Sequence, residues 1–155
     1  MVRVMATGVF DILHIGHLDY LKQAKALGDE LVVVIARDSR VRRMKHEPVT
    51  PEALRRELVD GLKPVDQALL GHEGDIYRTV EDVRPDIIAL GWDQEFDIEE
   101  VEAEVRRRGI PAKVVRLTKM EGDLDGTTKI INKVISLWSI QKQVERVEKT
   151  PPEGD

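Results

Sequence analysis

The 155-residue chain contains no cysteine, which excludes disulfide bonds, thiolate zinc sites and cysteine nucleophiles together. The absence fits a reducing compartment. No apolar run approaches the roughly 20 residues that a membrane-crossing helix needs. The N-terminus MVRVMATGVF lacks the charged segment and long apolar stretch of a signal peptide. We therefore expect a cytoplasmic protein that does not bind membranes.

A strong charge of one sign is also lacking, because the net charge is −5 at pH 7 with histidine neutral. This excludes a general nucleic-acid binder, although a nucleotide pocket can be locally positive in a negative protein. His46 and His72 show no metal-ligand spacing, so we predict no structural metal. No G-x-G-x-x-G follows the first apolar run, which argues against a plain NAD-binding domain.

Apolar runs alternate with segments of helical spacing along the chain. Strands are expected at 2–5, 31–36, 65–70, 87–90 and 112–117, and helices at 16–27, 50–62, 75–83, 97–108 and 126–144. The run LVVVIA at 31–36 is typical of a strand covered on both faces. The alternation predicts an α/β fold with an open parallel sheet and helices on both faces. We expect one domain over 1–145 and a disordered tail over 146–155.

In the second of these helices we expect Thr50 as N-cap, Pro51 at the first position, and Leu54, Leu58 and Leu62 on one inward face. Three loops that carry polar residues follow strands, at 7–17, 91–93 and 118–127. The carboxyl ends of parallel strands share one edge of the sheet, and ligands bind there. The three loops are therefore expected to form one site.

The loop at 7–17, TGVFDILHIGH, has features of a phosphate site. A strand that leads through a glycine-containing loop into a helix points unpaired N–H groups at an anion. His14 and His17 are three residues apart, so both can face one ligand and donate hydrogen bonds to it. Gly16 permits close backbone approach. The alternative for the histidines taken alone is that one packs or caps the helix and the other is solvated.

This loop resembles the signature of the HxGH nucleotidyltransferases, in particular their cytidylyltransferase-like branch. The resemblance extends over roughly residues 2–140 and implies a Rossmann-like α/β/α sandwich with a five-stranded parallel sheet in the order 3-2-1-4-5. It also implies a homodimer and an enzyme that moves a nucleoside monophosphate from a nucleoside triphosphate to a phosphorylated acceptor, with release of pyrophosphate. Mg²⁺ is expected to be held through the phosphates, with no metal site of protein ligands.

The same resemblance assigns the site residues. Catalytic roles fall to His14, His17 and Lys45. Nucleotide contacts are expected from Thr7, Gly8, Val9, Phe10, Asp11, His14, Ile15, Gly16, His17, Asp93, Met120, Thr127 and Thr128. Acceptor-side candidates are Asp11, Arg55 and Arg116.

Several of these assignments have an alternative. Arg42 and Arg43 compete with Lys45 for the phosphates. Asp93 could cap the following helix, and Thr127 could be an ordinary N-cap. Arg55 could be a surface residue of its helix.

The segments GDELVVVIARD, LKPVDQALLGHEGD, PDIIALGWDQ and AKVVRL look most like those of archaeal-type FAD synthases, which transfer AMP from ATP to FMN. Members of that group often carry cysteines near the C-terminus, and this chain has none. A CTP-dependent transferase acting on glycerol 3-phosphate or another small phospho-alcohol remains the alternative. A regulatory module that binds nucleotide without catalysis is a third possibility.

Overall fold

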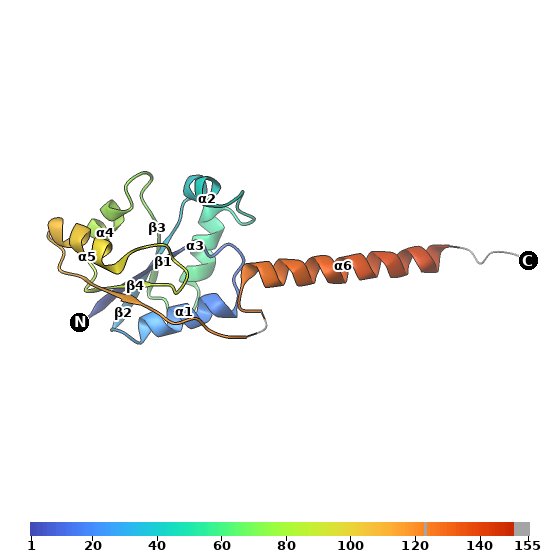
Figure 1. The fold of residues 1–155 in the computed structure, drawn as a ribbon, viewed down its shortest axis with the longest axis horizontal. Coiled ribbons are helices and arrows are strands. Elements are labelled where there is room, and N and C mark those ends of the chain that lie inside the picture. Colours follow the sequence, from blue (N-terminus) through green and yellow to red (C-terminus); the bar gives the residue numbers. More distant parts are fainter. Residues whose placement is uncertain (123, 151–155) are drawn as a thin grey trace, which may run out of the picture.

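The computed structural model describes residues 1–122 and 124–150, whose strands form one parallel sheet (Figure 1). The strands are β1 (Arg3–Gly8), β2 (Glu30–Ile35), β3 (Gln67–Leu70), β4 (Ile87–Leu90) and β5 (Lys113–Arg116). Their order is β3-β2-β1-β4-β5, which confirms the expected α/β class and strand order. The order reverses at β1, so the ends of β1 and β4 form the switch point at which such sheets bind ligands.

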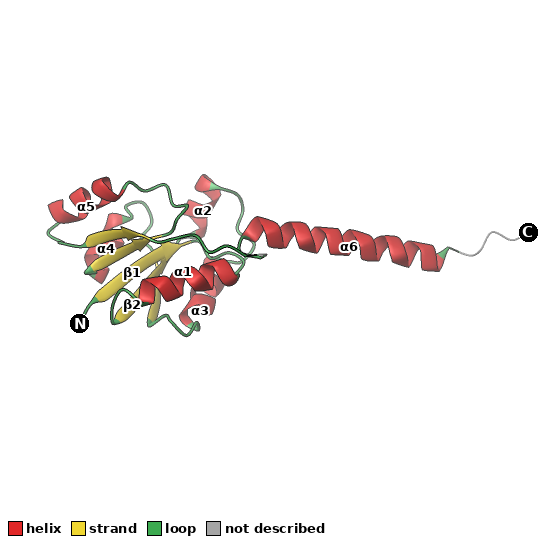
Figure 2. Cartoon of the chain, turned by 60° about the horizontal axis from the view of Figure 1, so that its bottom comes forward, coloured by secondary structure: helices red, strands yellow, loops and turns green. Residues whose placement is uncertain are grey.

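Helices cover both faces of this sheet (Figure 2). Because successive strand residues point to opposite faces, Val4 and Ala6 belong to one core and Met5 to the other. The first core includes residues of α1 (Ile15–Lys25) and α3 (Glu52–Asp60), and the second includes residues of α4 (Tyr77–Val83) and α5 (Ile98–Arg107). A short helix, α2 (Asp38–Met44), follows β2.

The inward face of α3 differs from the expected one. Leu54 and Leu58 are 51% and 52% exposed, whereas Arg55 and Val59 are fully buried. Only Leu62, beyond the end of α3, packs against the core as expected. Leu54 and Leu58 form one stripe along the helix, and Arg55 and Val59 form the stripe next to it. Residues in both stripes are four apart, so helical spacing alone does not say which stripe is buried. The structure buries the Arg55 stripe because the guanidinium finds hydrogen-bond partners inside the protein.

The last helix, α6 (Thr127–Lys149), leaves the body of the protein (Figures 1 and 2). It runs beyond the expected end at residue 144, so residues 146–149 of the expected tail are helical. Residues 151–155 of that tail lie outside the described part of the chain. Because α6 points away from the body of the protein, it is the first turn of this helix that lies nearest the sheet edge (Figure 1).

Within residues 1–122 and 124–150, no helix combines the length and hydropathy that a membrane crossing requires.

Candidate active site

A tight turn follows β1 and brings the Phe10 ring into the protein below the motif histidines. Phe10 has a φ of 54°, a left-handed conformation that is unfavourable for a residue with a side chain. Its buried ring lies 5.2 Å from the ring of His17 and 6.4 Å from that of Tyr20, centroid to centroid. A Cβ atom on Gly8 would come within 2.7 Å of the Phe10 ring. Gly8 is therefore required for this turn, which fixes where α1 begins.

His14 caps α1 through its side chain. Its Nδ1 accepts hydrogen bonds from the backbone N–H groups of Gly16 (3.1 Å) and His17 (3.4 Å). Burial lowers the pKa of His14, and the negative charge of Asp125 opposes this shift. A neutral imidazole that accepts at Nδ1 carries its proton on Nε2. The capping role and a donor role toward phosphate are thus compatible, and the cap selects the tautomer that donates from Nε2.

His17 lies directly against His14, with ring centroids 3.7 Å apart and planes inclined by 24°. Burial lowers the pKa of His17 to about 3, helped by the positive charges of His14 and Lys45. The side chain is therefore neutral at pH 7. Its Nδ1 is buried and has no hydrogen-bond partner within the described chain. A buried polar atom without a partner costs stability, and such atoms are often functional.

We expect the free energy of unfolding to fall by about 2 kcal/mol between pH 7 and pH 5 because of His17. In the unfolded chain His17 binds a proton near pH 6.5, whereas in the fold its pKa is about 3. Stability is therefore complete above pH 6.5 and decreases as the pH falls toward 3. Urea unfolding at both pH values measures this, and His17→Asn should remove most of the difference. A wild-type protein equally stable at both values would contradict the buried neutral state.

Lys45 lies on the same side as the histidines. It is exposed at the end of α2, and its charge contributes to lowering the pKa of His17. Its competitor Arg42 instead binds the Glu47 carboxylate through Nε (2.8 Å) and a terminal nitrogen (2.9 Å). The third candidate, Arg43, is exposed. The geometry thus favours Lys45 as the cation that approaches a ligand held by the histidines.

Two residues that sequence reasoning did not assign hold the ends of β1 and β4 together. The amide nitrogen of Gln94 donates to the carbonyl of Thr7 (2.9 Å), and its oxygen accepts from the Gly91 N–H (2.9 Å). The Tyr20 hydroxyl donates to the carbonyl of Ala89 (2.6 Å). Tyr20 follows His17 by one helical turn, and this spacing is the only signal in the sequence that could have identified it.

Asp93 is exposed in the loop after β4. The alternative that it caps the next helix is wrong, because the Asp97 carboxylate accepts from the Glu100 N–H and caps α5. The Asp93 carboxylate is near enough to contribute to raising the pKa of Tyr20, which is raised chiefly by burial. Asp93 lies in the loop after β4, at the switch point between β1 and β4.

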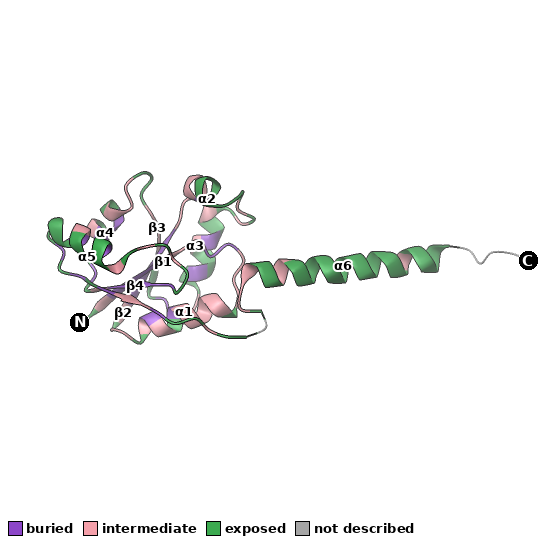
Figure 3. Ribbon diagram, in the orientation of Figure 1, coloured by how far each residue is buried: buried purple, intermediate pink, exposed green. Residues whose placement is uncertain are grey.

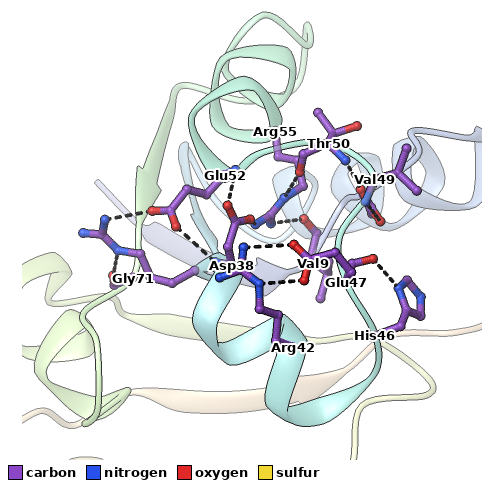
Figure 4. A network of polar contacts seen from close by, with 12 residues as sticks. Val9, Asp38, Arg42, His46, Glu47, Val49, Thr50, Glu52, Arg55 and Gly71 are labelled. Atoms are coloured by element: carbon purple, nitrogen blue, oxygen red, sulfur yellow. Dashed lines mark hydrogen bonds and ion pairs between the residues drawn. The ribbon is translucent and has the colours of Figure 1, made fainter.

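Arg55 is completely buried, and its guanidinium makes three hydrogen bonds inside the protein (Figure 4). It donates to the carbonyls of Thr50 (2.9 Å) and Val9 (2.8 Å) and to the Asp38 carboxylate (2.6 Å). Burial opposes ionisation of Asp38, but the hydrogen bond and charge of Arg55 prevail and lower its pKa. The alternative of a surface position for Arg55 is therefore wrong. Its guanidinium braces the turn at Val9 against two neighbouring segments.

Asp11 is buried and is also held by the protein. Its two carboxylate oxygens accept from the backbone N–H groups of Val49 (2.9 Å) and Thr50 (2.8 Å). The segment that follows Lys45 is thereby attached to the motif loop. The position of Lys45 relative to the histidines depends on this attachment.

Arg116, the third acceptor-side candidate, lies at the end of β5. Its guanidinium donates to the carbonyls of Gly91 (3.1 Å), Gln94 (2.8 Å) and Phe96. These contacts fix the loop that carries Asp93. Within the described structure, all three acceptor-side candidates thus have protein partners.

The segment before α6 forms the remaining wall. A Cβ atom on Gly16 would lie 2.3 Å from the Asp125 carbonyl, so glycine allows this segment to lie against the start of α1. Gly126 is the N-cap of α6 and provides no side-chain cap, so Thr127 is not the N-cap. Thr127 is half-buried and Thr128 is exposed in the first turn. Free N–H groups at a helix start suit a phosphate.

The two remaining assigned residues are Ile15, at the start of α1, and Met120, in the loop after β5. Ile15 is 43% exposed at the first position of α1, and Met120 is half-buried in the segment between β5 and α6. Among residues 1–122 and 124–150, no three His, Asp or Glu side chains are grouped so that they could hold a metal ion.

The chain is similar to known proteins of one family. The family model described as Cytidylyltransferase-like matches residues 5–146. The chain is 64% identical to the FAD synthase of Aciduliprofundum boonei over 136 residues, covering 87% of this chain and 91% of that protein. It is 52% identical to the FAD synthase of Thermoplasma volcanium over 137 residues, covering 88% and 96%.

A solved structure from Thermoplasma volcanium, described as a lipopolysaccharide core biosynthesis protein, has the same fold. It is 55% identical with a TM-score of 0.77, covering 78% of this chain and 99% of that one. The high identity and the nearly complete coverage of the FAD synthases place this chain beside them within the matched family. The chain belongs to the cytidylyltransferase-like family of nucleotidyltransferases, on the branch of the archaeal FAD synthases.

Proposed function

We propose that the protein is an FMN adenylyltransferase, which moves AMP from ATP to FMN and releases pyrophosphate. The observation that carries the proposal is the pair of stacked, neutral histidines at the start of α1, one of which has a buried nitrogen without a partner. Neutral imidazoles at a helix N-terminus suit the oxygens of a phosphate group. The relatives are named FAD synthases, and joining AMP from ATP to FMN is the reaction that makes FAD.

In the proposed reaction an oxygen of the FMN phosphate attacks the α-phosphorus of ATP in line. The new bond joins that oxygen to the α-phosphorus, and the bond from the α-phosphorus to the bridging oxygen breaks. No general base is needed, because the attacking phosphate is already ionised at pH 7. His14, His17, the first amides of α1 and Lys45 offset the charge that develops on the transferring group.

The remaining site residues bind the parts of ATP that surround the reacting phosphorus. Pyrophosphate leaves toward Thr127 and Thr128 at the start of α6. Asp93 accepts hydrogen bonds from the ribose hydroxyls. Asp11, Arg55 and Arg116 act as positioning residues through the loops that they brace. A Mg²⁺ ion would be held mainly through the phosphates of the nucleotide and would neutralise part of their charge.

A purified-enzyme assay that combines ATP or CTP with FMN, glycerol 3-phosphate or phosphoethanolamine tests the proposal. We expect pyrophosphate release with ATP and FMN, accompanied by FAD that is identified by chromatography. Release with CTP and a phospho-alcohol instead would favour the cytidylyltransferase alternative. Nucleotide binding without pyrophosphate release for every acceptor would favour a regulatory module. We further propose that the protein acts in the cytoplasm as a homodimer on small-molecule substrates only.

A further inference from the structure

The surface of α6 is apolar along most of its length, yet the helix has no buried residue (Figure 3). Seven large apolar side chains are between 49% and 76% exposed: Val134, Ile135, Leu137, Trp138, Ile140, Val144 and Val147. In the described chain, the side-chain hydrogen bonds of α6 join residues within 122–150 to one another. The helix is therefore not attached to the sheet, α1 or α3 by such bonds.

A helix with this surface needs a covering partner. Helices of this length gain most of their stability from packing of an apolar face. At roughly 100 Å² of exposed surface for each large apolar side chain, the seven side chains amount to about 700 Å². That area exceeds the few hundred Å² of an ordinary exposed patch. Leu137, Ile140, Val144 and Val147 lie on one side of the helix, so a single partner helix would cover about 400 Å² of it.

The spacing of the apolar residues indicates what that partner is. Leu137, Ile140, Val144 and Val147 follow one another at intervals of three, four and three, the a and d positions of a heptad. Ile130 lies one heptad before Leu137, but Lys133 occupies the position between them, so the continuous apolar seam runs from Leu137 to Val147. A seam of this kind packs against another helix of the same pattern.

Polar residues at the border of the seam argue against a membrane surface. Gln141 lies one turn after Leu137, and Glu148 lies one turn after Val144, so both are on the apolar side of the helix. A lipid surface would have to bury the Glu148 carboxylate, which is costly. A two-helix seam leaves such residues at its solvent-exposed border.

We propose that α6 pairs with α6 of a second copy of this chain, and that this pairing holds the phosphate-binding turn of α6 in the active site. A two-fold interface uses the same surface on both copies, which a self-complementary seam satisfies. The second half of the proposal rests on the proposed function. Thr127 and Thr128 begin the same helix, and the Asp125 carbonyl just before it lies against Gly16 at the start of α1. Whatever fixes the direction of α6 therefore also holds this turn at the start of α1.

The pairing of α6 with α6 of a second copy is tested by measuring the mass of the protein in solution by light scattering, without any substrate. We expect the wild type at twice the chain mass of 17.6 kDa and the variant Leu137→Glu/Ile140→Glu at the mass of one chain. Ser139→Glu, a matched control on the opposite side of the helix, should keep the wild-type mass. Thermal unfolding of the body should be the same in all three proteins, because α6 does not pack on the sheet.

Three results would overturn the pairing. The wild type could have the mass of one chain, or the double variant could keep the mass of two. The wild type could also be monomeric and float with phosphatidylglycerol–phosphatidylcholine vesicles, which would identify a membrane as the partner of α6.

The second half is tested by kinetics of the same three proteins with ATP and FMN. We expect the KM for ATP of the double variant to rise roughly tenfold, because the triphosphate loses a preorganised wall, whereas Ser139→Glu keeps the wild-type value. A monomeric double variant with an unchanged KM would refute the coupling to the site. An inactive wild type of dimeric mass would refute the proposed function alone, and the mass measurement would still decide the pairing.

Discussion

His17→Ala is expected to lower the kcat for FAD formation by roughly a hundredfold or more, as the loss of one preorganised transition-state donor does. The ring lies 3.7 Å from that of His14, and its nitrogen Nδ1 is buried without a partner. The side chain contributes little to holding the fold by hydrogen bonds, so the fold should survive its removal. Its loss should chiefly affect the state in which charge develops on the transferring phosphate.

Steady-state kinetics with ATP and FMN separate this role from a role in binding. An interaction that is made only in the transition state lowers kcat and kcat/KM by the same factor. His72→Ala serves as the matched control, because His72 is exposed and its ring contacts Asp82 outside the site. Near-normal turnover of His17→Ala would contradict the site assignment. A raised KM with unchanged kcat would assign His17 to ground-state binding of ATP.

The sheet could be predicted from the sequence because its strands are continuous apolar runs. The runs at 31–36 and 87–90 became β2 (Glu30–Ile35) and β4 (Ile87–Leu90), shifted by at most one residue. A strand buried on both faces leaves this mark in the sequence whatever surrounds it. The strand order came from the resemblance to a family, since apolar runs alone do not say which strands are neighbours.

The helices show where periodicity is insufficient. In α3 the stripes through Leu54 and through Arg55 both have helical spacing, and hydrophobicity alone selects the wrong one. The choice depends on Val9 and Asp38, which lie 46 and 17 residues from Arg55 in the sequence. In α6 the periodicity was present, but within residues 1–122 and 124–150 the structure places no other helix or strand against it.

Within the candidate site, the sequence pointed to the residues that we expect around the phosphates and missed the ones that hold the loops. His14 and His17 belong to a short motif, and their chemistry is evident from their type and spacing. Gln94 acts through its hydrogen bond to Thr7, 87 residues away in the chain, and Tyr20 through its hydrogen bond to Ala89, 69 residues away. A contact of that kind leaves no periodic signal, so only the folded structure shows it.

Arg55→Leu is expected to lower the free energy of unfolding by about 3–5 kcal/mol, as the loss of one partner from a buried ion pair does. The substitution leaves the Asp38 carboxylate without its guanidinium and the carbonyls of Thr50 and Val9 without donors. Urea unfolding measures the loss. Arg56→Leu, one residue along the same helix, is the matched control, since its contact with the Ala68 carbonyl is long at 3.5 Å. We expect it to cost less than about 1 kcal/mol.

A double-mutant cycle distinguishes a lost ion pair from lost packing. If the stranded carboxylate causes much of the loss, Asp38→Asn should cost less in the Arg55→Leu background than in the wild type, and the two effects should not add. Additive effects would show that Arg55 stabilises the fold without Asp38.

The same bonds brace the turn at Val9, so any folded Arg55 variant should also have a lower kcat/KM, with Arg55→Lys retaining more than Arg55→Leu. A folded Arg55→Leu protein with normal kcat/KM would show that the turn keeps its shape without the guanidinium, and Arg55 would then be a residue of stability only.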